Sequence, residues 1–438
     1  MPYNKATKYL AMTAIALCAT FHAATLHAAS TTSSTSADTA AAATTADVAA
    51  DPQDATPAAA PAAAPAAPAA APTWSVGPID FSGLVDGYYN FNANHPTDVG
   101  SDYPYGTQGR TFDTTSNGFA LSMVKLSMAH APDPIGFQVD LMFGPAVSLF
   151  NYGNDDIEQA YVAWKPTKGK GFEADFGQFV TSAGAEVIES MNNPNYSRSL
   201  LFQYLIPLYH VGLRTSMPIT KKETVGIQVV NGFNGNQSSD YSDNNAGKTI
   251  GLTSLYTRTN YNWALNYYVG PENIGTDKGY TNLIDTTLNL TPAAKSLAKW
   301  SGYINYDYTQ SRGATEIGST GQYKTTSLSH EQGVAMEARY QASAKVAFSG
   351  RYEYLYDASG GVTGGITNGN LSIPKASVDE FTVTGEYKMA EGLLARLEYR
   401  RDMSDNAIFV KGQATGNKLV KDQSTLELGV VAFFGPKR

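Results

Sequence analysis

Residues 135–144 read IGFQVDLMFG, and apolar and polar side chains alternate along this stretch. Phe137, Val139 and Leu141 share one phase, whereas Gln138 and Asp140 share the other. Because the side chains of a β-strand alternate between its two faces, the two sets lie on opposite faces. In a soluble sandwich the apolar face points inward, but in a transmembrane barrel it meets lipid and the polar face lines the lumen. The rest of the chain decides which solvent each face meets.

The composition argues against several classes of protein. The chain has 438 residues, of which 42% are hydrophobic, and its formal net charge is -8. Beyond the N-terminus no run of about 18 apolar residues occurs, so no transmembrane helix is expected, whereas barrel strands remain compatible with the composition. The acidic balance argues against nucleic acid as a partner. Cys18 is the single cysteine, so neither an intramolecular disulfide nor a cysteine metal site is expected.

The N-terminus is typical of an exported protein. Lys5 and Lys8 precede the short apolar stretch YLAMTAIALCATF, and the small residues that follow predict a signal peptide over residues 1–28, cleaved near Ala28. Lipidation at Cys18 is the competing interpretation, which Leu17 directly before it disfavours.

Residues 29–77 are rich in Ala, Thr, Ser and Pro and include TPAAAPAAAPAAPAAAPT. Such a segment has almost nothing to bury, so it predicts a disordered periplasmic linker, and a tether that contacts peptidoglycan is the alternative. The domain that follows is expected to span residues 78–438.

From residue 79 onward no convincing helix is expected, and candidate strands follow one another. Sixteen are predicted, at residues 79–91, 118–128, 135–144, 157–164, 171–179, 209–217, 224–230, 249–257, 261–269, 281–290, 300–309, 333–341, 345–356, 380–388, 393–401 and 424–434.

The connections between these strands alternate between long and short. NGFNGNQSSDYSDNNAGK is a long one, whereas RTN and AS are short. A soluble sandwich has no reason to sort its loops in this way, but an outer-membrane barrel has short periplasmic turns and long extracellular loops. The pattern predicts an all-β protein: a transmembrane antiparallel up-and-down barrel of about 16 strands, with its N- and C-termini in the periplasm.

Lipid outside the barrel places the charged phase of each strand in the lumen. A charge on the lipid face near the midplane would cost about 2–4 kcal/mol for Arg or Lys. The pore-lining candidates on strands are Asp140, Glu173, Asp175, His210, Arg214, Arg351, Glu353, Arg396, Glu398 and Arg400, and the same phasing turns Glu337, Arg339 and Glu427 inward and Tyr209 outward.

The connection at residues 180–208 is the candidate filler of the lumen. It contains Glu186, Glu189 and Arg198. Folded inward, it would narrow the pore and set selectivity by charge and size. An ordinary extracellular loop is the alternative.

Several stretches resemble one known family. They include FSGLVDGYYNFN near the first strand, FGQFVTSAGAEVIES, PLYHVGLR and GEYKMAEGLLARLEYRRDMSD near the C-terminus. Over residues 78–434 the sequence is similar to the putative beta-barrel porin-2 family, the OmpL-like outer-membrane porins. The resemblance implies an outer-membrane barrel with pore activity, and it brings neither a substrate nor catalytic residues. The family-like positions around the loop are Gly184, Glu186, Arg198, His210 and Arg214. The Ala/Pro linker and the tail GPKR after Phe434 depart from the family pattern.

Enzymatic and metal-binding hypotheses have weaker support. His330 beside Ser327 or Ser329 is the nearest approach to a nucleophile–base pair, and no Gly-x-Ser-x-Gly motif occurs. Asp240 and Asp243 lack the rest of a Ca²⁺ loop. No enzyme activity, metal or cofactor is therefore expected.

The sequence predicts a porin of the bacterial outer membrane that passes small hydrophilic solutes or ions by passive diffusion. The alternative is a closed or substrate-specific barrel that acts as a surface adhesin or structural anchor. Outer-membrane lipid and small solutes are the expected partners. The sequence leaves open the solute, the ion selectivity and a homo-oligomer such as a trimer.

Overall fold

The computed structural model describes residues 75–97, 106–149, 156–233, 245–318, 320–360, 375–413 and 416–435. The predicted signal peptide and residues 29–74 of the predicted linker lie outside these ranges, as do Asp240 and Asp243. The last part of the predicted linker includes β1 (Ser75–Val76), which pairs with β2 (Ile79–Asn92). Within the described ranges no helix is long and apolar enough to cross a membrane.

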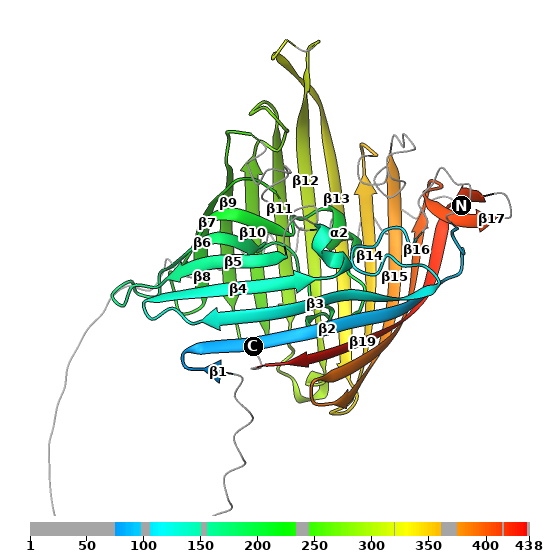
Figure 1. The fold of residues 1–438 in the computed structure, drawn as a ribbon, viewed down its shortest axis with the longest axis horizontal. Coiled ribbons are helices and arrows are strands. Elements are labelled where there is room, and N and C mark those ends of the chain that lie inside the picture. Colours follow the sequence, from blue (N-terminus) through cyan, green and yellow to red (C-terminus); the bar gives the residue numbers. More distant parts are fainter. Residues whose placement is uncertain are drawn as a thin grey trace, which may run out of the picture. The chain divides into compact units, whose positions relative to one another are not determined.

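Sixteen antiparallel strands form the main sheet, which Figure 1 shows together with the short β1. They are β2 (Ile79–Asn92), β3 (Gly118–His130), β4 (Ile135–Phe143), β5 (Ile157–Trp164), β6 (Glu173–Val180), β7 (Tyr209–Pro218), β8 (Glu223–Val230), β9 (Thr249–Thr257), β10 (Tyr261–Gly270), β11 (Tyr280–Leu290), β12 (Trp300–Glu316), β13 (Tyr323–Gln341), β14 (Val346–Asp357), β15 (Ala376–Ala390), β16 (Leu393–Ser404) and β19 (Asp422–Phe434).

The sheet closes on itself. Each strand from β2 to β15 pairs with the next in chain order, β16 pairs with β19, and β19 pairs with β2. In the closing pair Phe434 lies opposite Gly83 and Thr425 opposite Asn92. Closure leaves no unpaired sheet edge, which is the condition for a sheet to cross a bilayer. The predicted sixteen-strand antiparallel barrel is confirmed.

The outer face of the barrel is apolar, as the alternation predicts. On β4, Ile135 is 52% exposed, whereas Gln138 and Asp140 of the other phase are 8% and 2% exposed. The same pattern continues around the sheet. Exposed outward side chains include Val162, Phe176, Leu213, Ile227, Leu252, Leu265, Ile284, Phe348, Phe381, Leu397 and Leu428. An apolar band contributed by successive strands suits contact with hydrocarbon.

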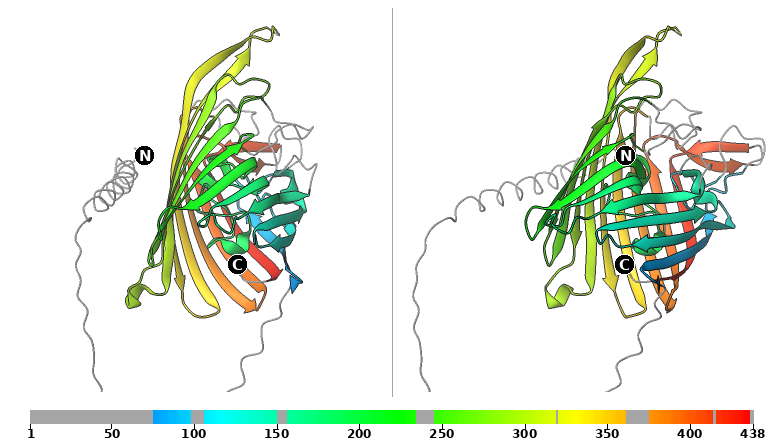
Figure 2. Two further views of the ribbon diagram at one scale, coloured as in Figure 1. Left: turned by 90° about the vertical axis from the view of Figure 1, so that its left-hand side faces the viewer. Right: turned by 60° about the vertical axis from the view of Figure 1, so that its left-hand side comes forward.

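The clearest difference from the predicted strands is at β12 and β13. Both extend beyond the predicted ranges, to Glu316 and from Tyr323, so that they project past their neighbours in every view of Figures 1 and 2. The extension reads YKTTSLSHEQ on β13 and is polar on both faces. Since both faces meet water there, no hydrophobic alternation marks the strand.

The connections also hold elements that the sequence did not predict. A second hairpin, β17 (Phe409–Gln413) with β18 (Gly416–Val420), lies in the connection between β16 and β19. Short helices are η1 (Pro145–Leu149), η3 (Ser190–Asn192), α2 (Leu200–Tyr204) and η4 (Lys295–Leu297).

The interior of the barrel has apolar packing as well as polar walls. Leu200, Leu201 and Leu205 form a buried cluster with wall residues such as Leu355 and with Phe409 of the second hairpin. Helix α2 lies within the outline of the barrel in Figure 1 and contacts β13 and β14. The connection between β6 and β7 therefore belongs to the core.

Candidate pore constriction

The connection from β6 to β7 folds into the barrel. Gly184 has a φ of +90°, a conformation that favours glycine, and its backbone N–H donates to Asp285 Oδ2 of β11 at 3.0 Å. The next residue, Ala185, donates its backbone N–H to Asn305 Oδ1 of β12 at 3.1 Å. Since β11 and β12 lie several strands from β6 around the sheet, the loop crosses the interior.

Glu186 holds the middle of the loop against the wall. Its Oε1 accepts hydrogen bonds from Arg351 Nη1 at 2.7 Å and from the Tyr303 hydroxyl at 3.0 Å. Its Oε2 accepts from the backbone N–H of Ser199 at 2.6 Å. Glu186 is only 5% exposed, and a buried carboxylate is tolerated when its oxygens are satisfied in this way.

Helix α2 begins inside the barrel and is capped from two directions. Ser199 is the N-cap, and its Oγ accepts from the backbone N–H of Phe202 at 3.0 Å. Glu353 of β14 accepts from the backbone N–H groups of Leu200 and Leu201 at 2.7 and 3.3 Å. The wall carboxylate thus satisfies donors that the first turn of a helix leaves unpaired.

Three arginines of the wall bind carbonyl oxygens of the same loop. Arg351 Nη1 donates to Ser197 O at 2.8 Å, Arg396 Nη2 to Asn193 O at 2.7 Å, and Arg400 Nη1 to Arg198 O at 2.7 Å. These guanidinium groups bind the backbone of the loop, so the loop is anchored through its main chain as well as through its side chains.

Tyr196 and Ser197 join the loop to β16 and β2, the two strands that pair with β19. Their backbone N–H groups donate to Glu398 of β16 at 2.6 and 3.1 Å. The Tyr196 hydroxyl donates to Asp86 Oδ1 of β2 at 2.6 Å. Burial, reinforced by the negative charge of Asp86, raises the pKa of Tyr196 well above its ordinary value. The hydroxyl therefore stays protonated and serves as a donor.

Arg198 shapes the loop and does not face water. Its Nη1 donates to Tyr196 O at 2.7 Å, its Nη2 donates to Ile188 O, and the side chain is buried. Its guanidinium lies 4.4 Å from the centre of the Phe112 ring. Phe112 belongs to the connection after β2, which the sequence did not predict to fold inward.

A second ion cluster lies where β3, β4 and β5 face the loop. Lys125 Nζ is 2.8 Å from Glu158 Oε2 and 3.2 Å from Asp140 Oδ2, and it also pairs with Glu189 of the loop. Gln159 Nε2 donates to Asp140 Oδ2 at 2.6 Å. Lys125 and Glu158 were not among the pore-lining residues predicted from the sequence. Lys125 could have been found because it is a charge within the alternating stretch MVKLSM.

Arg214 of β7 pairs with Asp175 of β6, with 2.7 Å between Nε and Oδ2. Its guanidinium lies 4.9 Å from the Tyr161 ring centre and 4.6 Å from that of Phe179. The Arg214 side chain is 23% exposed. It is held by the wall yet reachable by water.

Glu173 and His210 lie apart from the constriction. Glu173 pairs with Lys165 at 2.9 Å, and both are substantially exposed at the end of the barrel that bears the short turns. His210 is fully buried, bonded to Thr181 and Gly232 and stacked on Tyr268 with ring centres 5.1 Å apart. It contributes to wall packing.

Water reaches the interior unevenly. Arg351, Glu353, Arg396, Glu398 and Arg400 are each 2% exposed or less. By contrast the side chains of Arg214 and Glu189 are 23% and 16% exposed. On the loop itself, Val187 is 43% exposed. The loop therefore buries the middle of β14–β16, whereas Arg214 of β7 keeps part of its surface in solvent.

Tyr209 does not lie exposed on the outer face, contrary to the sequence prediction. Tyr209, predicted on the outer face, is 2% exposed and belongs to an apolar cluster with the loop residue Ile206. It is the first residue of β7, where loop residues cover it.

Ser329 bonds to Ser311 across the β12–β13 pair, whereas His330 lies between Tyr308 and Tyr356.

Ser329 and His330 are neighbours on one strand, so they point to opposite faces and form no nucleophile–base pair. In the described part of the chain, no group of three or more His, Cys, Asp or Glu side chains is arranged to hold a metal ion.

Comparison with known families gives one match. The model of the family described as "Putative beta-barrel porin-2, OmpL-like" matches residues 78–434. The comparison with curated proteins gives no match.

Solved structures of outer-membrane proteins are similar to this chain at low identity. The anion-selective porin of Comamonas acidovorans is 11% identical, with a TM-score of 0.50 over 81% of this chain and 99% of its own. The outer membrane channel DcaP of Acinetobacter baumannii is 11% identical, with a TM-score of 0.49 over 81% and 97%. The trimer form of in-vitro folded OmpT of Vibrio cholerae is 13% identical, with a TM-score of 0.49 over 81% and 99%.

Proposed function

The chain belongs to the putative beta-barrel porin-2 family, OmpL-like, and from this we propose that it is a water-filled channel of the outer membrane for passive diffusion of small hydrophilic solutes or ions. A porin of the outer membrane is what the family and the closed barrel establish; the passage of solutes is the proposal. A sixteen-strand barrel is wide enough to leave an aqueous channel unless its interior is filled.

The uneven exposure of the interior carries this proposal. The β6–β7 loop fills the side of β14–β16, where Arg351 and Arg400 are fully buried. Polar side chains on the other side, above all Arg214, remain in contact with water. We infer that the passage runs between the loop and the wall formed by β5–β7.

Charge and size would select solutes at this narrowing. Arg214 and Asp175 form an ion pair on the wall, and Glu189 of the loop pairs with the buried Lys125 of β3. A small solute passes between two such pairs without a large electrostatic barrier, because both signs are close by. No chemical step is needed, since passive diffusion requires only a hydrated path.

The orientation proposed for the barrel follows from its connections. The short turns and both ends of the barrel sheet, at Ile79 and Phe434, lie at one end. We assign this end to the periplasm and the long connections to the cell exterior, as in other outer-membrane barrels.

Liposome swelling tests the proposal. The full-length chain, refolded into lipid vesicles, is expected to admit small sugars such as arabinose and to exclude long dextrans. Swelling that slows steadily as solute size grows would support a diffusion channel. Vesicles that hold correctly folded barrel but do not swell with any solute would overturn it.

The dense packing on the side of β14–β16 favours one second candidate. Arg351 contacts Glu186, Glu353 and Glu380 within 3.1 Å with all four side chains essentially buried. If the same packing extended across the lumen, the barrel would be a closed anchor whose long connections act at the cell surface. The swelling assay separates the two, because a closed barrel admits no solute.

A further inference from the structure

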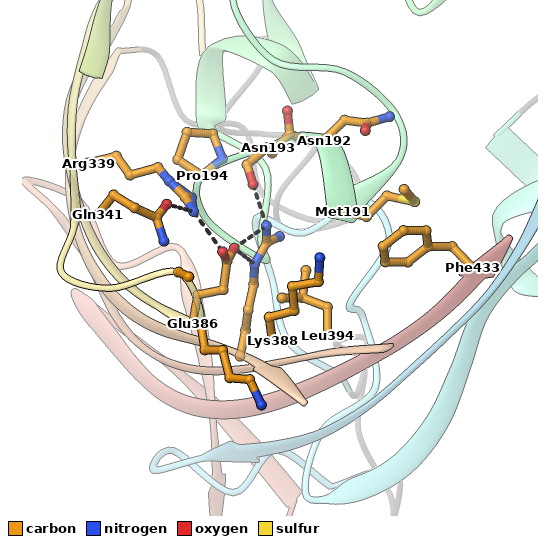
Figure 3. Close-up of a pocket in the computed structure, with 13 residues that line it drawn as sticks. Met191, Asn192, Asn193, Pro194, Arg339, Gln341, Glu386, Lys388, Leu394 and Phe433 are labelled. Atoms are coloured by element: carbon orange, nitrogen blue, oxygen red, sulfur yellow. Dashed lines mark hydrogen bonds and ion pairs between the residues drawn. The ribbon is translucent and has the colours of Figure 1, made fainter. Parts of the chain in front are cut away.

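A cavity of about 490 Å³ lies on the inner side of the barrel, between the β6–β7 loop and strands β13, β15, β16 and β19. Residues 191–194 of the loop form one side, and Arg339 and Glu386 form part of the other (Figure 3). Arg396 also lines the cavity. The turn residue Lys345 places the cavity toward the short-turn end of the barrel. Its volume is typical of sites for small molecules.

The cavity is basic, with two of its cations available to a ligand. Four of its lining residues are basic, whereas Glu386 is the only acidic one: the lining residues with ionisable side chains are Arg339, Lys345, Lys388, Arg396 and Glu386. Two cations are occupied. Arg396 binds Glu386 at 2.8 Å and Asn193 O at 2.7 Å, and Lys388 Nζ pairs with Glu391 at 2.7 Å.

Arg339 uses only its Nη2, which contacts Glu386 at 2.7 Å and Gln341 at 2.9 Å. Its Nε and Nη1 have no hydrogen-bond partner within the described ranges, and neither has the exposed Nζ of Lys345. These groups differ from the other interior arginines, such as Arg351 and Arg400, whose guanidinium groups bind the loop and carboxylates.

The opposite side of the cavity holds three apolar side chains, with Lys388 beside one of them, Leu394. Met191 and Phe433 lie together across from Arg339 and Gln341 in Figure 3, and Leu394 lies below them. A ligand in this space would meet cationic donors at one end and a sulfur, an aromatic ring and an aliphatic chain at the other. Such a division suits an anion with an apolar body.

We propose that this cavity binds small organic carboxylates, with the carboxylate at Arg339 and Lys345 and the apolar body against Met191, Leu394 and Phe433. A planar guanidinium with free N–H groups binds a carboxylate with directional, charge-assisted hydrogen bonds. The proposal deepens the proposed function by naming a solute class, but binding itself does not require an open channel.

Calorimetric titration of benzoate into the full-length chain, refolded in a zwitterionic detergent, tests the proposal. We expect saturable binding at one site per chain. Acetate, which lacks the ring, is expected to bind about tenfold more weakly or worse. Benzylammonium, which keeps the ring and reverses the charge, is expected to show no saturable binding.

Two variants and a matched control locate the site. Arg339→Gln is expected to weaken benzoate binding about tenfold or more, because a charge-assisted hydrogen bond is lost. Lys345→Gln, at an exposed turn, is expected to weaken it about threefold. Lys221→Gln makes the same change of charge at another short turn outside the cavity, and its affinity is expected to stay within about twofold.

Several results would overturn the proposal. One is the absence of saturable benzoate binding, and another is benzylammonium binding as tight as that of benzoate. A third is wild-type affinity for benzoate in both variants, Lys345→Gln and a correctly folded Arg339→Gln. If Arg339→Gln does not fold, Lys345→Gln alone decides. A channel that conducts without binding benzoate would contradict only this inference, whereas a barrel that binds benzoate but admits no solute would contradict only the proposed function.

Discussion

Charged residues inside the barrel fall into two groups that differ in their access to water. Arg351, Arg400 and Glu353 are sealed between wall and loop, whereas Arg214 and Glu189 keep part of their surface in solvent. Buried charges are held by specific partners and chiefly affect stability, because removal of one partner leaves the others uncompensated. Solvated charges chiefly affect which ions enter. The two groups therefore call for different measurements.

Arg351→Met should destabilise the barrel. The change would leave Glu186, Glu353 and Glu380 without their shared cation, at an expected cost of about 3–5 kcal/mol in the free energy of unfolding. Urea unfolding in detergent, followed by tryptophan fluorescence, measures it. Arg401→Met is the control, because Arg401 forms an exposed pair with Asp422 and should cost less than about 1 kcal/mol. Equal losses of unfolding free energy in the two variants would show that the buried cluster stabilises the barrel no more than an exposed ion pair does.

Arg214→Gln should change ion selectivity while the fold stays intact. It removes a solvated positive charge and leaves Asp175 unpaired beside the passage, so preference for cations should increase. The reversal potential in a salt gradient reports the change. Lys324→Gln, exposed near the tip of the β12–β13 hairpin, serves as the control. A reversal potential that moves equally in both variants, or in neither, would place the passage elsewhere.

At the scale of elements, the β6–β7 loop is the part that turns a wide barrel into a narrow one. Val180 and Tyr209 already pair at the ends of β6 and β7, so the strands need no long connection to meet. The intervening residues instead contact β11, β12, β14 and β16 through backbone and side-chain hydrogen bonds. The loop is thus an insertion in the β6–β7 hairpin that the pairing of the two strands does not require.

Replacing residues 182–207 with a Gly-Ser-Gly turn should raise single-channel conductance several-fold. The strands can still pair at Val180 and Tyr209, while the material that crosses the lumen is gone. Replacing the tip at residues 317–322 with Asn-Gly should leave conductance unchanged. If the loop variant folds and conducts as the wild type does, the loop does not form the narrowing.

The strands could be predicted from sequence because lipid on one side imposes a strict alternation. In β4 and β16 that alternation fixes the inner phase of Asp140 and Arg400. The ends of β12 and β13 escaped prediction because both faces meet water there. Helix α2 and the β17–β18 hairpin escaped because their partners, such as Leu200 and Phe409, are far apart in sequence and meet only in the folded barrel.

The position of a residue in the strand alternation predicts which side of the sheet its side chain faces, but it does not predict what the side chain does there. Arg198 and His210 carry polar groups that the sequence places near the lumen, yet each is bonded to backbone oxygens and buried. Their partners come from other connections or strands, which no local pattern reveals. The part that each candidate plays in permeation stays a prediction.

At the scale of the whole molecule, the barrel combines an apolar exterior with an interior that holds both packed and solvated side chains. Closure through the β2–β19 pair satisfies the backbone. The loop and the second hairpin give the barrel an internal hydrophobic cluster. The proposed passage of solutes requires that the solvated part of the interior be continuous from one end of the barrel to the other.

Single-channel conductance of the full-length chain, refolded into a planar lipid bilayer, tests this continuity most directly. Stable, stepwise currents of uniform size are expected, smaller than those of the variant that lacks residues 182–207. Folded wild-type barrel that remains electrically silent, while the loop variant conducts, would contradict an open passage and identify the protein as a closed barrel.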